Sequence, residues 1–324
     1  MLTRRATLAG FIGAAAIAAR PARAQAFPSR TITIIVPYPA GGPTDVLARL
    51  VAQNAAADLG QSIVVDNRGG GAGVTGSVLA MRAEPDGHTL VLGTNQTHAT
   101  NQSLLKNHPF DAAKDFAGVA ELAEVPHILV TRKDLGVPNA LDLVRLAKEK
   151  QGGLTCGSTG VGSASHLAME LFKTQTGAPM VHVPFRGSAP LATELVAGRI
   201  DLSFATLPTV AAFLDAGDIK ALAVASAKRT TRLPGVPTLK ESGVEGVEAD
   251  AWFALFAPAR TPPAILDRLY QATARALNVD AAKTVLAAQG MTLALKSPAE
   301  LSAMIPVEIA KWAAVIKAAN VNID

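Results

Sequence analysis

The sequence predicts an α/β fold in which helices cover both faces of parallel sheets. Short runs rich in valine and isoleucine alternate with stretches rich in alanine and leucine between residues 31 and 256. The runs are typical of buried strands, and the stretches between them place apolar residues at helical spacing. Regular alternation of the two is the pattern of α/β architecture. Beyond residue 256 only the helical spacing continues.

The expected strands are short, rich in β-branched residues and bounded by glycine, proline or polar residues. The first leads into a loop of proline and glycine, and the second into a loop rich in glycine. In chain order the expected strands cover residues 31–36, 62–66, 89–92, 128–131, 154–156, 180–183, 200–204, 221–224 and 252–256.

Helices are expected between most of these strands and through the C-terminal part. In the first helix Val46, Leu50 and Leu59 fall on one face. The C-terminal helices follow a late strand, so we expect the chain to return there and pack on its first part. The expected helices lie near residues 43–58, 75–82, 141–150, 164–174, 190–196, 209–216, 262–277, 280–288 and 298–319.

The formal net charge of +4 belongs to the N-terminal stretch. Four arginines are the only charged residues among the first 24, and the other 300 residues carry 26 basic and 26 acidic side chains. A basic surface for nucleic acid or for an anionic membrane is therefore not expected.

Residues 1–24 have the pattern of a cleaved export leader. Arg4 and Arg5 precede an apolar run at 8–19 that is too short to span a bilayer, and Ala22-Arg23-Ala24 matches a cleavage site. The paired arginines also fit a twin-arginine leader, and an uncleaved anchor is the alternative. No later run approaches the length of a membrane span, so the rest of the chain is expected to be soluble and not inserted in the membrane.

Two sequence features have simple structural interpretations. The single cysteine, Cys156, excludes an intramolecular disulfide and is expected to be a small buried hydrophobe. The glycines of residues 71–76 match G-x-G-x-x-G after a strand, which suggests a dinucleotide site. However, the motif follows the second expected strand, and no carboxylate ends the next one. A glycine loop that opens a helix and binds an anion is the alternative.

Patterns for catalysis and for metal binding are absent from the sequence. There is no H-E-x-x-H, G-x-S-x-G or P-loop motif. Ser158 and Ser163 lie in a glycine-rich segment, but no base lies near them in the sequence. We therefore expect no catalytic residue, no metal and no cofactor.

Loops suited to anion binding recur between strand ends and helix starts. Backbone amides at such helix N-termini lack partners and carry the positive end of the helix dipole. In open α/β sheets these loops meet beyond the carboxyl ends of the strands. A ligand with carboxylate groups is therefore expected, with Arg186 as a charged donor. The loops cover residues 38–44, 69–76, 157–163 and 186–188.

Long segments in these loops resemble the Bug-type receptors, the periplasmic substrate-binding components of tripartite tricarboxylate transporters. The resemblance covers essentially the whole chain after the leader. Its longest segments are VPYPAGGPTDVLARL (36–50), DNRGGGAGVTG (66–76) and GSTGVGSASHLAMELF (157–172). It implies a type II-like periplasmic binding protein, a clam shell with two crossover strands. Domain one would comprise 25–125 plus 251–324, and domain two 126–250.

The resemblance also implies a ligand site between the two domains. The loop after the first strand would hold a carboxylate, with Asp45 supporting the loop, and His166 has the alternative of a purely structural histidine. The implied ligand-binding residues are Tyr38, Pro39, Ala40, Gly41, Gly42, Asp45, Asn95, Ser158, Thr159, Gly160, Ser163, His166, Arg186, Ala205 and Thr206.

One position departs from the family pattern. Members usually carry aspartate after the phenylalanine of the strand near 200–204, and this chain has Ala205 there, followed by Thr206. Loss of that carboxylate removes an acceptor for a ligand ammonium group and removes repulsion of a second ligand carboxylate. We therefore expect a dicarboxylate or an acid with an uncharged tail, and not an amino acid.

The expected function is a monomeric periplasmic receptor that binds a small organic carboxylate. Its implied partners are the membrane subunits of a transporter, or a sensor protein. The alternative is an exported NAD(P)-dependent oxidoreductase that uses the loop Gly71–Gly76. A hydrolase with Ser158 or Ser163 as nucleophile is a more remote alternative.

Overall fold

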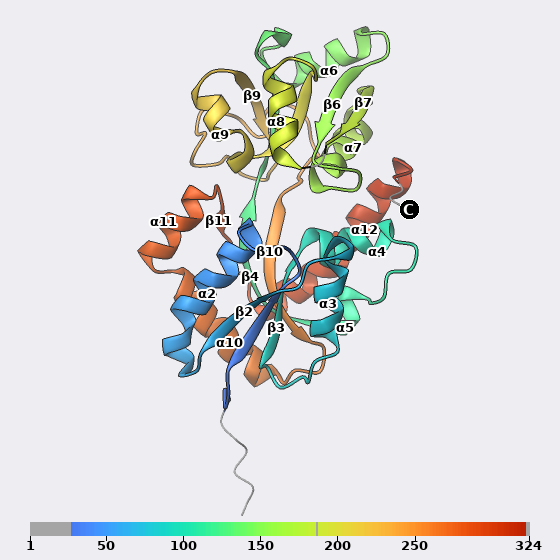
Figure 1. Cartoon of the computed structure of the whole chain (residues 1–324). Helices are drawn as coiled ribbons and strands as arrows, with labels where there is room; N and C mark the ends of the chain where they lie inside the picture. The colour runs from blue at the N-terminus through green and yellow to red at the C-terminus, as the bar shows by residue number, and fades with distance from the viewer. Residues whose placement is uncertain (1–26, 186, 322–324) are drawn as a thin grey trace, which may run out of the picture.

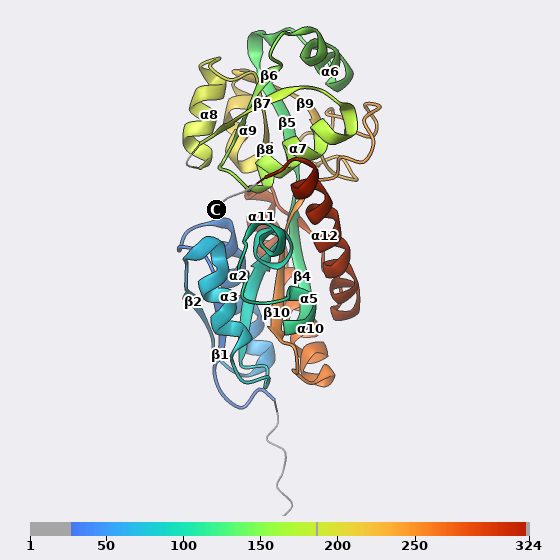
Figure 2. The ribbon, with the colours of Figure 1, turned by 90° about the vertical axis from the view of Figure 1, so that its right-hand side faces the viewer.

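The computed structural model describes residues 27–185 and 187–321. The predicted leader, residues 1–24, and Arg186 lie outside the described residues. The chain forms two sheets, each with its own helices, which follow one another along the long axis of the molecule (Figure 1; Figure 2).

The first sheet has the strand order β11-β4-β10-β3-β1-β2, and the second has the order β7-β6-β8-β5-β9. The strands of the first sheet are β1 (Ile32–Val36), β2 (Ile63–Asn67), β3 (Thr89–Thr94), β4 (Phe116–Val125), β10 (Ala251–Pro258) and β11 (Thr292–Leu293). The strands of the second are β5 (His127–Arg132), β6 (Leu154–Ser158), β7 (Met180–Pro184), β8 (Leu202–Thr206) and β9 (Ile219–Val224).

The sheets are mixed, so the expectation of parallel sheets is wrong. β1 runs parallel to β2 and β3, and β6 runs parallel to β7 and β8. β10 is antiparallel to β3 and β4, and β5 is antiparallel to β8 and β9. The cause is the route of the chain. The chain enters the second sheet through β5 and returns to the first through β10. Each of these strands therefore starts at the edge of its sheet where the parallel strands end.

Helices cover both faces of the first sheet. α2 (Pro43–Leu59) and α10 (Pro263–Leu277) share an apolar core with one face, and α3 (Val74–Met81) and α12 (Pro298–Ala318) share a core with the other. The C-terminal helices therefore return to the first sheet as expected. The remaining α-helices of eight residues or more are α6 (Ala140–Glu149), α7 (Ala164–Thr176), α8 (Ser188–Val196), α9 (Leu207–Asp215) and α11 (Asp280–Ala288).

The strand β4 and a group of short elements were missed by the sequence interpretation. β4 contains Gly118, Glu121 and Glu124, which interrupt an apolar run, yet its core-facing residues are buried. The short elements are β11, α4 (Asn101–Leu104), α5 (Ala112–Asp115) and the π-helical turn η2 (Gln96–Thr100). The short elements escape prediction because none is long enough to show a periodic pattern. Their conformation depends on tertiary packing.

The chain passes between the sheets twice, at Pro126 and at Asp250 (Figure 1). The two passages are joined, since His127 Nδ1 donates to the carbonyl oxygen of Ala249 at 2.6 Å. The proposed division into 25–125 plus 251–324 and 126–250 stays a prediction. Across the described residues, no helix is both long enough and apolar enough to cross a membrane.

Candidate functional site

The loop after β1 lies at the edge of the first sheet that faces the second. Pro39, Ala40 and Gly41 are exposed there, and Gly41 has a φ of +88°, in the left-handed region that favours glycine. Gly42 precedes α2, and no side chain caps the first turn of that helix. The amides of this turn therefore face outward with the positive end of the helix dipole.

Asp45 holds this loop in place from beneath. Its carboxylate is buried and accepts hydrogen bonds from Gly41 N at 3.0 Å, Arg49 Nε at 2.9 Å and Asn67 Nδ2 at 3.0 Å. The hydrogen bond from Arg49 is the largest cause that holds the pKa of Asp45 below its usual range. Because its oxygens are already engaged, Asp45 supports the loop and is not itself available to a ligand.

Replacing Asp45 with alanine is expected to weaken ligand binding about tenfold, because Gly41 N loses the acceptor that fixes the loop. Loss of the three hydrogen bonds to this carboxylate also lowers stability by about 1–3 kcal/mol. Calorimetric titration, together with thermal unfolding, measures both effects. Arg49→Gln, which removes only the exposed partner, serves as the control, and equal losses for both variants would contradict the role assigned to Asp45.

The Tyr38 hydroxyl points to the first sheet, and Asn95 is buried. The Tyr38 hydroxyl lies 2.9 Å from Thr94 Oγ1 and donates to Gln96 Oε1 at 3.2 Å. Burial raises the pKa of Tyr38 to about 12, so its hydroxyl stays neutral. Asn95 is buried at the start of η2. Tyr38 therefore supports the loop from behind.

Packing accounts for two glycines of the 71–76 motif, Gly73 and Gly76. A Cβ atom on Gly76 would lie 2.8 Å from Arg68 O and 2.9 Å from Pro37 Cα, and one on Gly73 would collide with Thr97. These glycines allow α3 to lie against the loop after β1. The G-x-G-x-x-G match thus has a structural cause that involves no nucleotide.

A cavity of about 150 Å³ lies at the facing edge of the second sheet. The N-terminal ends of α7, α8 and α9 all reach it. Three of the predicted residues, Thr159, Ala205 and Thr206, line it. Its complete lining is His127, Thr159, Ala164, Ser165, Ser188, Leu191, Phe204, Ala205, Thr206, Thr209 and Ala251. These described lining residues include no carboxylate and many hydroxyl groups.

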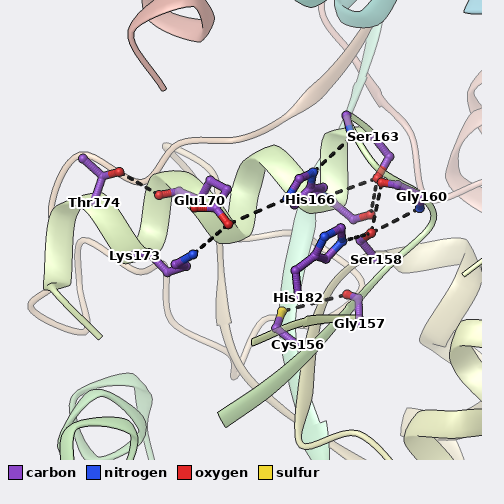
Figure 3. Close-up of polar contacts among 12 residues, drawn as sticks. Cys156, Gly157, Ser158, Gly160, Ser163, His166, Glu170, Lys173, Thr174 and His182 are labelled. Atoms are coloured by element: carbon purple, nitrogen blue, oxygen red, sulfur yellow. Dashed lines mark hydrogen bonds and ion pairs between the residues drawn. The ribbon is translucent and has the colours of Figure 1, made fainter. Parts of the chain in front are cut away.

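The loop 158–163 is held by a network of serines and histidines (Figure 3). Ser163 caps α7, and Ser158 Oγ accepts from Gly160 N at 3.1 Å. Gly162 N donates to His166 Nδ1 at 3.0 Å, and the His166 ring stacks on His182 at 3.7 Å between centroids. His166 therefore orients the backbone of this loop, as a structural histidine would.

No base lies near Ser158 in the sequence, but the fold places a histidine beside it. His182 Nε2 lies 2.5 Å from Ser158 Oγ (Figure 3). Burial is the main cause that lowers the pKa of His182 to about 4. The sequence holds no local sign of this pair, because the parallel register of β6 and β7 joins residues far apart in the chain. Ser158 is fully buried, and among the described residues no carboxylate bonds to His182. The pair thus fits a role in positioning the loop better than attack on a substrate.

The described residues divide the predicted site into two groups. Tyr38, Asp45 and Asn95 belong to the first sheet's edge, while the second edge holds Ser158, Thr159, Gly160, Ser163 and His166 with the cavity residues Ala205 and Thr206. No hydrogen bond between described residues joins the two groups. Arg186, the predicted charged donor, lies outside the described residues. Cys156 is buried as expected, and burial raises the pKa of its thiol.

Comparison with known proteins identifies the family. Residues 47–321 match the family model described as tripartite tricarboxylate transporter family receptor. The chain belongs to this receptor family. It is 36% identical to protein BugT of Bordetella pertussis, over 98% of this chain and 97% of that protein.

Several solved structures are similar in fold to this chain over most of its length. A TctC solute-binding protein from Polaromonas, without ligand, has a TM-score of 0.81 and 31% identity, covering 90% of this chain and 99% of the other. R. palustris Rpa4515 with adipate has a TM-score of 0.77 and 38% identity, covering 92% and 100%. MatC from Rhodopseudomonas palustris with malate has a TM-score of 0.73 and 33% identity, covering 90% and 100%.

Proposed function

We propose that this receptor binds a small dicarboxylate in the periplasm, between the loop 38–42 and the cavity at the edge of the second sheet. The observation that carries the proposal is the meeting of three helix N-termini at a cavity whose described lining contains no carboxylate. Each helix N-terminus favours an anion by about 0.3–1 kcal/mol at an exposed site. Several such ends attract an anion without any net charge on the protein.

The loop after β1, at the edge of the first sheet, and the cavity, at the edge of the second, bind opposite ends of the ligand. One ligand carboxylate binds the uncapped first turn of α2 beside Gly41, and the other binds the hydroxyls and amides of the cavity. Ala205 offers no acceptor to an ammonium group, which disfavours an amino acid. The adipate and malate bound by two relatives are both dicarboxylates, which supports this ligand class.

Closure of the two domains about the passages at Pro126 and Asp250 brings both edges onto the ligand. The receptor then presents the closed form to the membrane subunits of a tripartite tricarboxylate-type transporter. The protein acts by binding alone and uses no cofactor. The helix N-termini and loops around the site need only hydrogen bonds to hold an anion.

Calorimetric titration tests this proposal directly. We expect succinate or adipate to bind at least tenfold more tightly than aspartate, glutamate or NAD, with citrate as a probe of a third carboxylate. The affinity should change little between low and moderate salt, because the attraction is local and partly shielded from solvent. Tight binding of the amino acids alone, or binding of NAD, would overturn the proposal.

A further inference from the structure

His127 occupies a position where the ligand cavity meets the passages between the sheets. It is the first residue of β5, directly after Pro126. It lines the cavity together with Ala251, the first residue after the other passage. Sequence reasoning did not single it out, because a lone histidine before an apolar strand is not distinctive.

The hydrogen bond made by Nδ1 fixes which nitrogen of His127 carries the proton. The partner of Nδ1 is the carbonyl oxygen of Ala249, at 2.6 Å, and a carbonyl oxygen can only accept. Nδ1 must therefore be protonated. The neutral ring then carries a lone pair on Nε2, which makes Nε2 an acceptor.

The environment keeps this ring neutral. His127 is only 2% exposed, and burial lowers its pKa to about 4. Near neutral pH the cavity thus contains an imidazole acceptor and no imidazolium. Among the described residues, no donor is bonded to Nε2.

Most of the hydroxyl groups nearby already have a partner within the protein. Ser165 Oγ accepts from Thr159 N at 3.0 Å, and Thr206 Oγ1 lies 3.1 Å from Thr209 Oγ1. A ligand carboxylate would be repelled by a lone pair, so Nε2 calls for a donor on the ligand. An ammonium group is disfavoured by the helix N-termini and by the absence of a carboxylate, whereas a hydroxyl group is uncharged and donates.

We infer that His127 is a specificity-determining residue whose Nε2 accepts a hydrogen bond from a hydroxyl group on the ligand. The receptor then prefers a hydroxy-dicarboxylate to the matching plain dicarboxylate. This inference rests on the proposed function and narrows its ligand class. A site built to bond a hydroxyl group rejects the analogue that lacks it, because the buried acceptor is left without a partner.

The test compares matched pairs of acids by calorimetry. Malate is compared with succinate and 2-hydroxyglutarate with glutarate, using both enantiomers of each hydroxy acid, so that chain length and stereochemistry are controlled. For the wild-type protein we expect one enantiomer of at least one hydroxy acid to bind about tenfold more tightly than its plain partner.

Two variants separate the ligand contact from the structural bond of His127. In His127→Asn the amide nitrogen replaces Nδ1 and donates to Ala249 O, but no acceptor remains at the Nε2 position. In His127→Gln the amide oxygen reaches the Nε2 position. We expect the hydroxy-to-plain affinity ratio to fall about tenfold in His127→Asn and to be largely retained in His127→Gln.

Each outcome has a distinct meaning. If none of the acids binds the wild-type protein, the proposed function fails and the role of His127 fails with it. If the acids bind but the wild-type ratio is near one, or if His127→Asn leaves the ratio unchanged, the dicarboxylate function stands and only the role of His127 is overturned. Thermal unfolding of each variant checks that the ratios come from folded protein.

Discussion

Replacing Gly41 with leucine is expected to weaken dicarboxylate binding a hundredfold or more. The added side chain would meet no protein atom within 4 Å of its Cβ, so it projects into the space where the ligand carboxylate is proposed to bind. It also blocks the approach of a ligand to the uncapped first turn of α2. The φ of +88° adds a backbone cost of about 1–2 kcal/mol. Calorimetry with succinate or adipate measures the loss.

The other end of the same helix offers a matched control. Gly60 follows α2, has a φ of +68°, and likewise has no atom within 4 Å of an added Cβ. Gly60→Leu should therefore lower the melting temperature about as much as Gly41→Leu but leave the affinity unchanged. If Gly41→Leu bound dicarboxylates like the wild-type protein, the loop after β1 would not hold the ligand.

Local patterns were sufficient to predict most of the fold. The β-branched runs and helical spacings located the main strands and helices, because these elements bury one face along their whole length. β4 was missed because Glu121 and Glu124 break its apolar run. Strand direction was also wrong for β5 and β10, since direction depends on where the chain enters each sheet and not on local sequence.

The parts of the candidate site formed by loop backbone could be predicted from the sequence. The hydrogen bonds between residues far apart in the chain could not. Glycine-rich loops at strand ends mark helix N-termini in the sequence itself, so the loops near Gly41 and Gly160 were found. The bonds Ser158–His182 and His127–Ala249 join residues 24 and 122 positions apart. Only the sheet register and the double passage between the sheets bring those residues together.

Replacing Ala205 with aspartate is expected to reverse the ligand preference. Ala205 is 4% exposed and lines the cavity at the end of β8. A carboxylate about 5 Å from the distal carboxylate of a bound dicarboxylate would cost about 3 kcal/mol at an effective dielectric constant near 20. The affinity for succinate or adipate should therefore fall a hundredfold or more, while aspartate or glutamate gains an acceptor for its ammonium group.

The isosteric variant Ala205→Asn isolates the effect of charge. It has almost the same shape as aspartate, so any steric loss is common to both, and only Ala205→Asp should show the additional hundredfold loss for dicarboxylates. Raising the salt concentration should restore little of it, because a buried pair of charges is poorly screened. Equal affinities of the two variants for succinate would mean that the distal carboxylate does not reach the cavity, and the dicarboxylate would then have to bind by the loop after β1 alone.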